Sequence, residues 1–124
     1  MQFSSRQFAD VAVAAPLGRI DHAAAGELER ALAPLLPASG SGRTGVVLDF
    51  AGVDYISSVG LRVLMIAAKQ SRTNGARIAV AALQPVVAEI FAISRFDHVL
   101  EVFPSVRGAL EKLSAPALAA FDAT

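Results

Sequence analysis

The chain has 124 residues, of which 54% are hydrophobic and 18% charged, and its formal net charge is zero. This length fits one domain with a sizeable core. The charges are balanced and scattered, which excludes an electrostatic case for binding nucleic acid or an anionic membrane. The lack of cysteine excludes disulfides and thiolate metal sites and is compatible with a reducing, cytoplasmic location. No apolar run approaches the roughly 20 residues that span a bilayer, so we expect no direct membrane insertion.

The N-terminal third predicts a hairpin followed by a helix. Residues 3–8 and 11–17 have the pattern of two short paired strands. Asp21 is a favourable N-cap for a helix whose apolar residues recur at helical spacing and which ends at Pro37. Residues 38–45, rich in Gly and Ser, predict a flexible loop.

The central part predicts a buried strand over 45–50, then a loop that contains residues 54–58. A long helix is predicted over 58–73, because Asn74-Gly75 is a typical helix stop. This loop lies where a strand leads into a helix. In parallel sheets that is the edge at which ligands and partners usually bind.

The C-terminal part predicts a strand over 77–81, a helix opened by Gln84-Pro85, a strand over 99–103 and a helix over 105–113. The expected organisation is a single domain over residues 1–113 with a C-terminal tail over 114–124. This tail is either a loose extension or packs back through Leu118 and Phe121. Strands that alternate with helices predict an α/β fold with a mostly parallel sheet flanked by helices.

The serine pair Ser57-Ser58 stands at the predicted start of the long helix. Serine is a favoured N-cap, and the same helix end attracts anions through its free N–H groups and the helix dipole. A phosphate added to a serine here would cost the fold little. The alternative is that the two serines only cap the helix.

The residue patterns of several enzyme and metal sites are missing. His22 and His98, the two histidines, lie far apart in the sequence without ligand-spaced acids. Gly40 and Gly42 precede a strand rather than a helix, so they do not form a phosphate-binding loop. Asp49 ends a buried strand, as in response-regulator receivers, but the acidic residues and the lysine that receivers need elsewhere are missing. We therefore expect no metal, no cofactor and no enzymatic activity.

Segments 18–21, 47–50, 54–64 and 83–110 together resemble the STAS domain family, the bacterial anti-sigma factor antagonists. The resemblance implies a mixed, mostly parallel sheet of four or five strands flanked by about four helices. It also implies a function in transcription regulation by protein–protein interaction. In that family, the domain binds an anti-sigma factor with serine kinase activity, phosphorylation of a serine releases it, and a PP2C-type serine phosphatase restores binding.

Alignment on Gly60-Leu61 places Ser58 at the phosphoacceptor of the family pattern Asp-Ser-Ser/Thr-Gly-Leu. Ser57 then stands where aspartate is usual, and Val59 is a second departure. Ser57 is therefore a second candidate for phosphorylation. An alternative that the resemblance also implies is a STAS regulatory subunit of a transport complex, docked on an ABC-type ATPase.

The second helix has more apolar surface than one buried face requires, which is typical of a docking patch or of deeper packing on the sheet. For Gly60, close approach of a partner backbone and tight internal packing remain alternatives. We expect the partner surface to comprise Arg19, Asp21, His22, Ser57, Ser58, Val59, Gly60, Arg62 and Val63.

Overall fold

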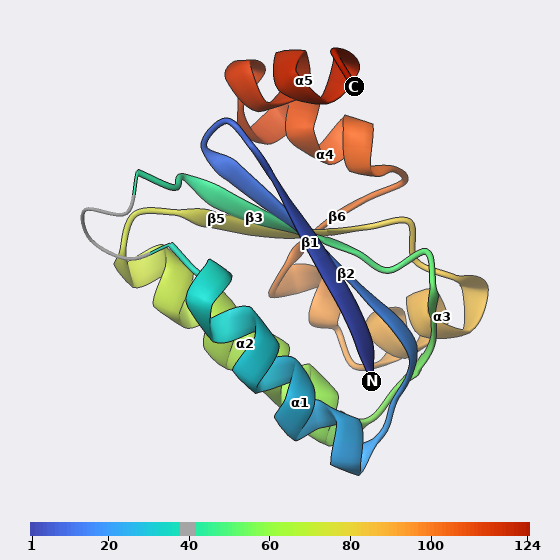
Figure 1. Cartoon of the computed structure of the whole chain (residues 1–124). Coiled ribbons are helices and arrows are strands. Elements are labelled where there is room, and N and C mark those ends of the chain that lie inside the picture. The colour runs from blue at the N-terminus through green and yellow to red at the C-terminus, as the bar shows by residue number, and fades with distance from the viewer. Residues whose placement is uncertain (38–41) are drawn as a thin grey trace.

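Six strands form one mixed sheet within residues 1–37 and 42–124, which the computed structural model describes (Figure 1). The main path runs β1-β2-β3-β5-β6, and β4 pairs with the end of β2. β1 and β2 are antiparallel, and the other pairs in this part of the chain are parallel, which confirms the predicted fold class. The bounds are β1 Gln2–Phe8, β2 Val11–Ile20, β3 Gly45–Asp49, β4 Val53–Ile56, β5 Arg77–Ala81 and β6 Glu101–Phe103.

Helices cover both faces of the sheet (Figure 1). On one face lie α1 (His22–Leu32), α2 (Ser58–Thr73) and α3 (Pro85–Ile93), each of which connects two parallel strands. Right-handed crossovers that step in one direction along a sheet place their helices on the same face. On the other face lie α4 (Val106–Leu113) and α5 (Ala115–Asp122). The short 3₁₀ helices η1 (Ala33–Leu35) and η2 (Phe96–His98) follow α1 and α3.

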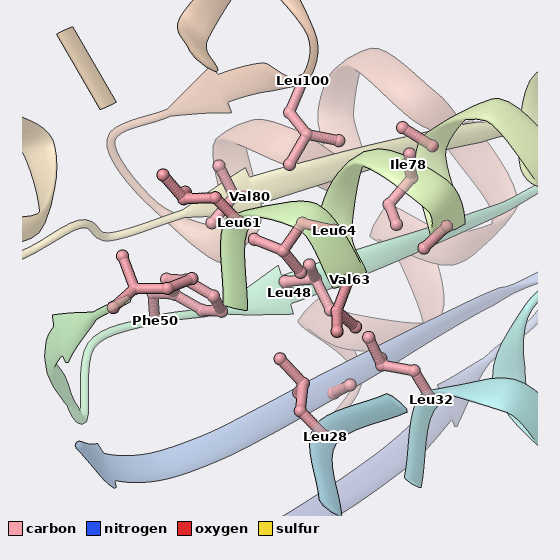
Figure 2. Packing of buried hydrophobic residues seen from close by; sticks show 14 of the residues in the cluster. Leu28, Leu32, Leu48, Phe50, Leu61, Val63, Leu64, Ile78, Val80 and Leu100 are labelled. Carbon is pink, nitrogen blue, oxygen red and sulfur yellow. The ribbon is translucent and has the colours of Figure 1, made fainter. Parts of the chain in front are cut away.

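The larger hydrophobic cluster fills the space between the sheet and α1, α2 and α3 (Figure 2). Leu28 and Leu32 of α1 face Leu64 of α2 across it, and all three side chains are at most 1% exposed. On the other face, Phe121 of α5 packs edge-on against Phe8, with ring centroids 5.4 Å apart. The tail over residues 114–124 is therefore not a loose extension: it contains α5, which packs back on the sheet.

Three differences from the prediction concern the sheet. Part of the expected loop after β3 is the strand β4, and β2 runs on past residue 17 to Ile20 so that the two can pair. Pro16 is tolerated inside β2 because it lies between the stretch that pairs with β3 and the stretch that pairs with β4. Neither β3 nor β4 pairs with β2 at this residue. The last strand begins at Glu101 rather than at residue 99. Residues 38–41 of the predicted loop 38–45 lie outside the described part.

Candidate functional site

Two strands end side by side at one edge of the sheet, and each leads directly into a helix. Ile20 of β2 pairs with Ile56 of β4, and the backbone N–H of Ser57 donates to the carbonyl of Ile20 at 2.8 Å. The next residues, Asp21 and Ser57, are the N-caps of α1 and α2. The β2–β4 pairing therefore brings the first turns of two helices together.

The two caps use different side chains for the same purpose. The Asp21 carboxylate accepts the backbone N–H of Ala24 at 2.9 Å, and the Ser57 hydroxyl accepts that of Gly60 at 3.1 Å. Each satisfies one of the N–H groups that a helix start leaves without an intrahelical partner. The predicted cap of α1 is confirmed, and of the two serines it is Ser57 that caps α2.

Ser58 is the first residue of α2, and its side chain is exposed. Its hydroxyl forms no hydrogen bond with any residue in the described ranges. The two adjacent serines are therefore in different chemical situations: the oxygen of Ser57 is engaged in the fold, whereas the oxygen of Ser58 is available to a reagent or a partner.

A shift in the pairing of β2 with β4 shapes the surface beside the serines, because Asp54 of β4 is an extra residue between the pairs Gly18–Val53 and Arg19–Tyr55. Gly18 has a φ of +92°, its N–H donates to the carbonyl of Gly52 at 2.7 Å, and the register with β4 shifts between Gly18 and Arg19. The shifted register pairs Arg19 with Tyr55, and the guanidinium carbon lies 4.0 Å from the centre of the Tyr55 ring. Such a stack holds an exposed arginine in one orientation. Tyr55 was missed as a site residue, although its place just before the serines was a signal.

The structure separates the nine residues predicted for the partner surface into two groups. Seven reach the surface, either exposed or half-buried: Arg19, Asp21, His22, Ser57, Ser58, Val59 and Arg62. Gly60 and Val63 are buried.

Gly60 allows close packing inside the domain, between the start of α2 and the strands β2 and β4. A β-carbon on it would lie 2.8 Å from a side-chain carbon of Ile56 and 2.9 Å from one of Ile20. The structure therefore favours tight internal packing over approach of a partner backbone, because α2 could not start so close to β2 and β4 with a larger residue.

Val63 is 9% exposed and lines a crevice of about 80 Å³ between α1 and α2. Its neighbour in that crevice, Ile66, is 47% exposed. The expected apolar surface of α2 thus exists, but Ile66 contributes more of it than Val63 does.

Two further observations concern metal binding and membrane-spanning helices. Among the described residues, no three His, Cys, Asp or Glu side chains come together in a way that could hold a metal ion. None of the helices within those ranges is both long enough and apolar enough to cross a membrane.

Comparison with known proteins identifies the family. The model of the STAS domain family matches residues 3–109. A protein of Bordetella bronchiseptica named "Putative anti-sigma factor antagonist BtrV" is 41% identical over 87 residues, which are 70% of this chain and 70% of that protein.

Solved structures with the same fold include both bacterial regulators and a transporter. An anti-sigma factor antagonist from Mycobacterium paratuberculosis matches with a TM-score of 0.80 at 22% identity, over 90% of this chain and 92% of that one. The phosphorylated form of the Bacillus cell fate determinant SpoIIAA matches with a TM-score of 0.67 at 13% identity, over 90% and 98% of the two chains. The murine anion transporter Slc26a9 matches with a TM-score of 0.71 at 18% identity, over 86% of this chain and 18% of that one.

At such identities the solved structures establish a common fold alone. The family assignment rests instead on the family model, which covers most of the chain, and on the Bordetella relative. On these two grounds the chain belongs to the STAS domain family.

Proposed function

We propose that this chain is an anti-sigma factor antagonist, a non-catalytic domain of the cytoplasm whose binding is switched by phosphorylation of Ser58. Its partner is an anti-sigma factor with serine kinase activity. The kinase transfers the γ-phosphoryl group of ATP to the Ser58 oxygen, which loses its proton, and ADP leaves. A PP2C-type phosphatase hydrolyses the phosphoserine and restores binding.

The observation that carries this proposal is the contrast between the two serines. The Ser58 hydroxyl is exposed and without a hydrogen bond in the described part of the chain, whereas the Ser57 hydroxyl caps α2. Modification of Ser57 would disturb the cap, while modification of Ser58 leaves it in place. This contrast favours Ser58 over Ser57 as the phosphoacceptor.

The charge of a phosphate explains how one modification would abolish binding without unfolding the domain. The group adds a charge of about −1.5 to −2 at neutral pH. At the N-terminus of α2 the helix dipole and the free N–H groups favour a negative charge. A partner packed over Ser58 would instead bury that charge, which is costly unless the partner supplies matching cations.

The surface that such a partner would cover surrounds Ser58. The stacked Arg19 and Tyr55 stand on β2 and β4 just before the two helix starts, His22 begins α1, and Val59 and Arg62 follow Ser58 on α2. The crevice with Ile66 continues this surface along α2. Arginine and tyrosine are residues that often dominate binding energy at interfaces.

The test combines phosphorylation, binding and folding. The purified protein would be incubated with ATP and each anti-sigma factor kinase encoded in the same genome, beside Ser57→Ala and Ser58→Ala variants. We expect a gain of one phosphate by intact mass, which Ser58→Ala loses and Ser57→Ala keeps. No incorporation with any of these kinases would contradict the proposal.

A second arm uses Ser58→Glu, which we expect to lose partner binding while it keeps the melting temperature of the unmodified protein. Undiminished binding of Ser58→Glu to the anti-sigma factor would contradict the proposed switch. The alternative role is that of a regulatory subunit of a transport complex. In that case the protein should bind an ABC-type ATPase, and Ser58→Glu should not change this binding.

A further inference from the structure

Arg62 lies one helical turn after Ser58 on α2. Residues four apart on a helix lie on the same side, with β-carbons about 5–6 Å apart. Both side chains are exposed, and neither forms a hydrogen bond or an ion pair with any residue in the described ranges. Arg62 is also the only charged residue between positions 55 and 68. The first cation after Ser58 is therefore within its reach and uncommitted.

The other charged groups around the helix start are less suited to meet a phosphate on Ser58. Arg19 on β2 is stacked on Tyr55, and the carboxylate of Asp21 is engaged in capping α1. Asp54 on β4 is exposed and would repel a phosphate, and His22 is an exposed group at the start of α1. These surroundings leave Arg62 as the cation best placed to compensate a phosphate.

The cap of α2 bears on the same question. Ser57 caps the helix with a neutral hydroxyl. An aspartate at this position would place a carboxylate on the residue next to the phosphoserine, and the two negative charges would repel each other. The combination of a neutral cap before Ser58 and a guanidinium one turn after it suits a doubly charged group.

We propose that Arg62 binds the phosphate of phosphorylated Ser58 in a charge-assisted pair across one turn of α2. The inference rests on the proposed phosphorylation of this serine. It gives Arg62 two states: its guanidinium faces the partner when Ser58 is unmodified, and it is occupied by the phosphate after modification. Phosphorylation would then both add a charge to the partner surface and withdraw a cation from it.

The experiment places phosphoserine at position 58 of the full chain during translation, so that it needs no kinase. The titration of the phosphate would be followed by ³¹P NMR in the phosphoprotein, in its Arg62→Gln variant and in its Arg72→Gln variant. Arg72 is the matched control, because it is an exposed arginine in the last turn of the same helix. Circular dichroism would confirm that all three proteins are folded.

We expect Arg62→Gln to raise the second pKa of the phosphate, which is about 6 in free phosphoserine, because the nearby cation favours the dianion. Arg72→Gln should leave that pKa unchanged. An identical titration in the phosphoprotein and its Arg62→Gln variant would overturn the proposal.

A binding measurement on the same phosphoprotein distinguishes the phosphorylation switch from the pair between Arg62 and the phosphate. If it still binds the anti-sigma factor while Arg62→Gln raises the phosphate pKa, the pair exists and the proposed function fails. If it loses binding while Arg62→Gln has no effect on the titration, the switch stands and the role of Arg62 is refuted.

Discussion

Ser57 and Ser58 are neighbours in the sequence, yet their hydroxyls differ in what they contact. The Ser57 oxygen holds the N–H of Gly60, while its own backbone N–H is bonded to Ile20. Ser57 therefore connects β2, β4 and the start of α2 at a single residue. Ser58 is exposed, and its hydroxyl forms no hydrogen bond within the described part of the chain.

We predict that Ser57→Ala lowers the free energy of unfolding by about 1 kcal/mol, the typical cost of losing a side-chain N-cap. Ser57→Asp should restore most of this loss, since aspartate caps helices equally well. The free energies would be measured by urea denaturation, with Ser58→Ala as the control that changes little. A loss for Ser58→Ala as large as that for Ser57→Ala would contradict the assignment of the cap.

Two helical glycines are predicted to respond in opposite ways to alanine. At Gly60 the added methyl group would meet Ile56 and Ile20 at under 3.0 Å, so Gly60→Ala should destabilise the domain by about 1–3 kcal/mol. At Gly26 in α1 the nearest such contact is the end of the Arg30 side chain at 3.5 Å, so Gly26→Ala should stabilise it by about 0.5–1 kcal/mol. Thermal melts of both variants check this, and effects of the same sign would refute it.

At the scale of elements, the C-terminal helix is fastened to the N-terminal hairpin. Ser114 ends α4 and caps α5, and its hydroxyl also donates to the carboxylate of Asp10 in the β1–β2 turn. Thr44, just before β3, donates to the other oxygen of the same carboxylate. Together with the Phe8–Phe121 contact, these bonds explain why residues 114–124 are packed and not loose.

Asp10 gives this attachment a predicted pH dependence. The hydroxyl of Ser114 and then that of Thr44 hold the pKa of the Asp10 carboxyl below its ordinary value. A carboxylate whose pKa is lower in the folded state contributes stability above its unfolded pKa, and this contribution is lost as the pH falls through the folded pKa. We expect Asp10→Ala to lose about 1 kcal/mol at pH 7, the size of one net hydrogen bond.

The measurement is urea denaturation of the wild-type protein and of Asp10→Ala at a series of pH values. The difference in stability between them should be constant from pH 7 to about pH 5. It should shrink as the pH falls below the ordinary aspartate pKa of about 4 and onward through the lower pKa of the folded carboxyl. A difference that does not depend on pH would show that the charge of Asp10 plays no part in fastening α5.

At the scale of the whole molecule, a single sheet carries a hydrophobic cluster on each face. Alternate residues of the same strands point into the two clusters, as with Leu48 on one face and Val47 on the other. Neither cluster can open without loss of the strands that the other needs, so we expect the domain to unfold in one cooperative step.

The only tyrosine offers a direct test, because Tyr55 lies in β4 beside the candidate site and the chain has no tryptophan. Urea unfolding followed by Tyr55 fluorescence should coincide with unfolding followed by far-ultraviolet circular dichroism. An earlier fluorescence transition would mean that β4 and the site open separately from the rest of the domain.

Much of the architecture was readable from local patterns. The helix over 58–73, the cap at Asp21, the proline that opens α3 and the strand over 77–81 all depend on neighbours within a few residues, and the structure confirms them. Local rules of capping, periodicity and helix stops determine such features, because the interacting groups are close in the sequence.

The arrangement of the candidate site depended on contacts between distant segments. β4 exists because β2 continues past Pro16 to meet it, and that pairing also stacks Arg19 on Tyr55 and places the starts of α1 and α2 together. Whether Val63 or Ile66 faced outward was decided by where α1 lies against α2. The sequence by itself determined most of the elements and the serine pair; the tertiary structure decided that β4 forms, which serine is free and what surrounds it, because only packing brings residues 18–21 beside residues 53–58.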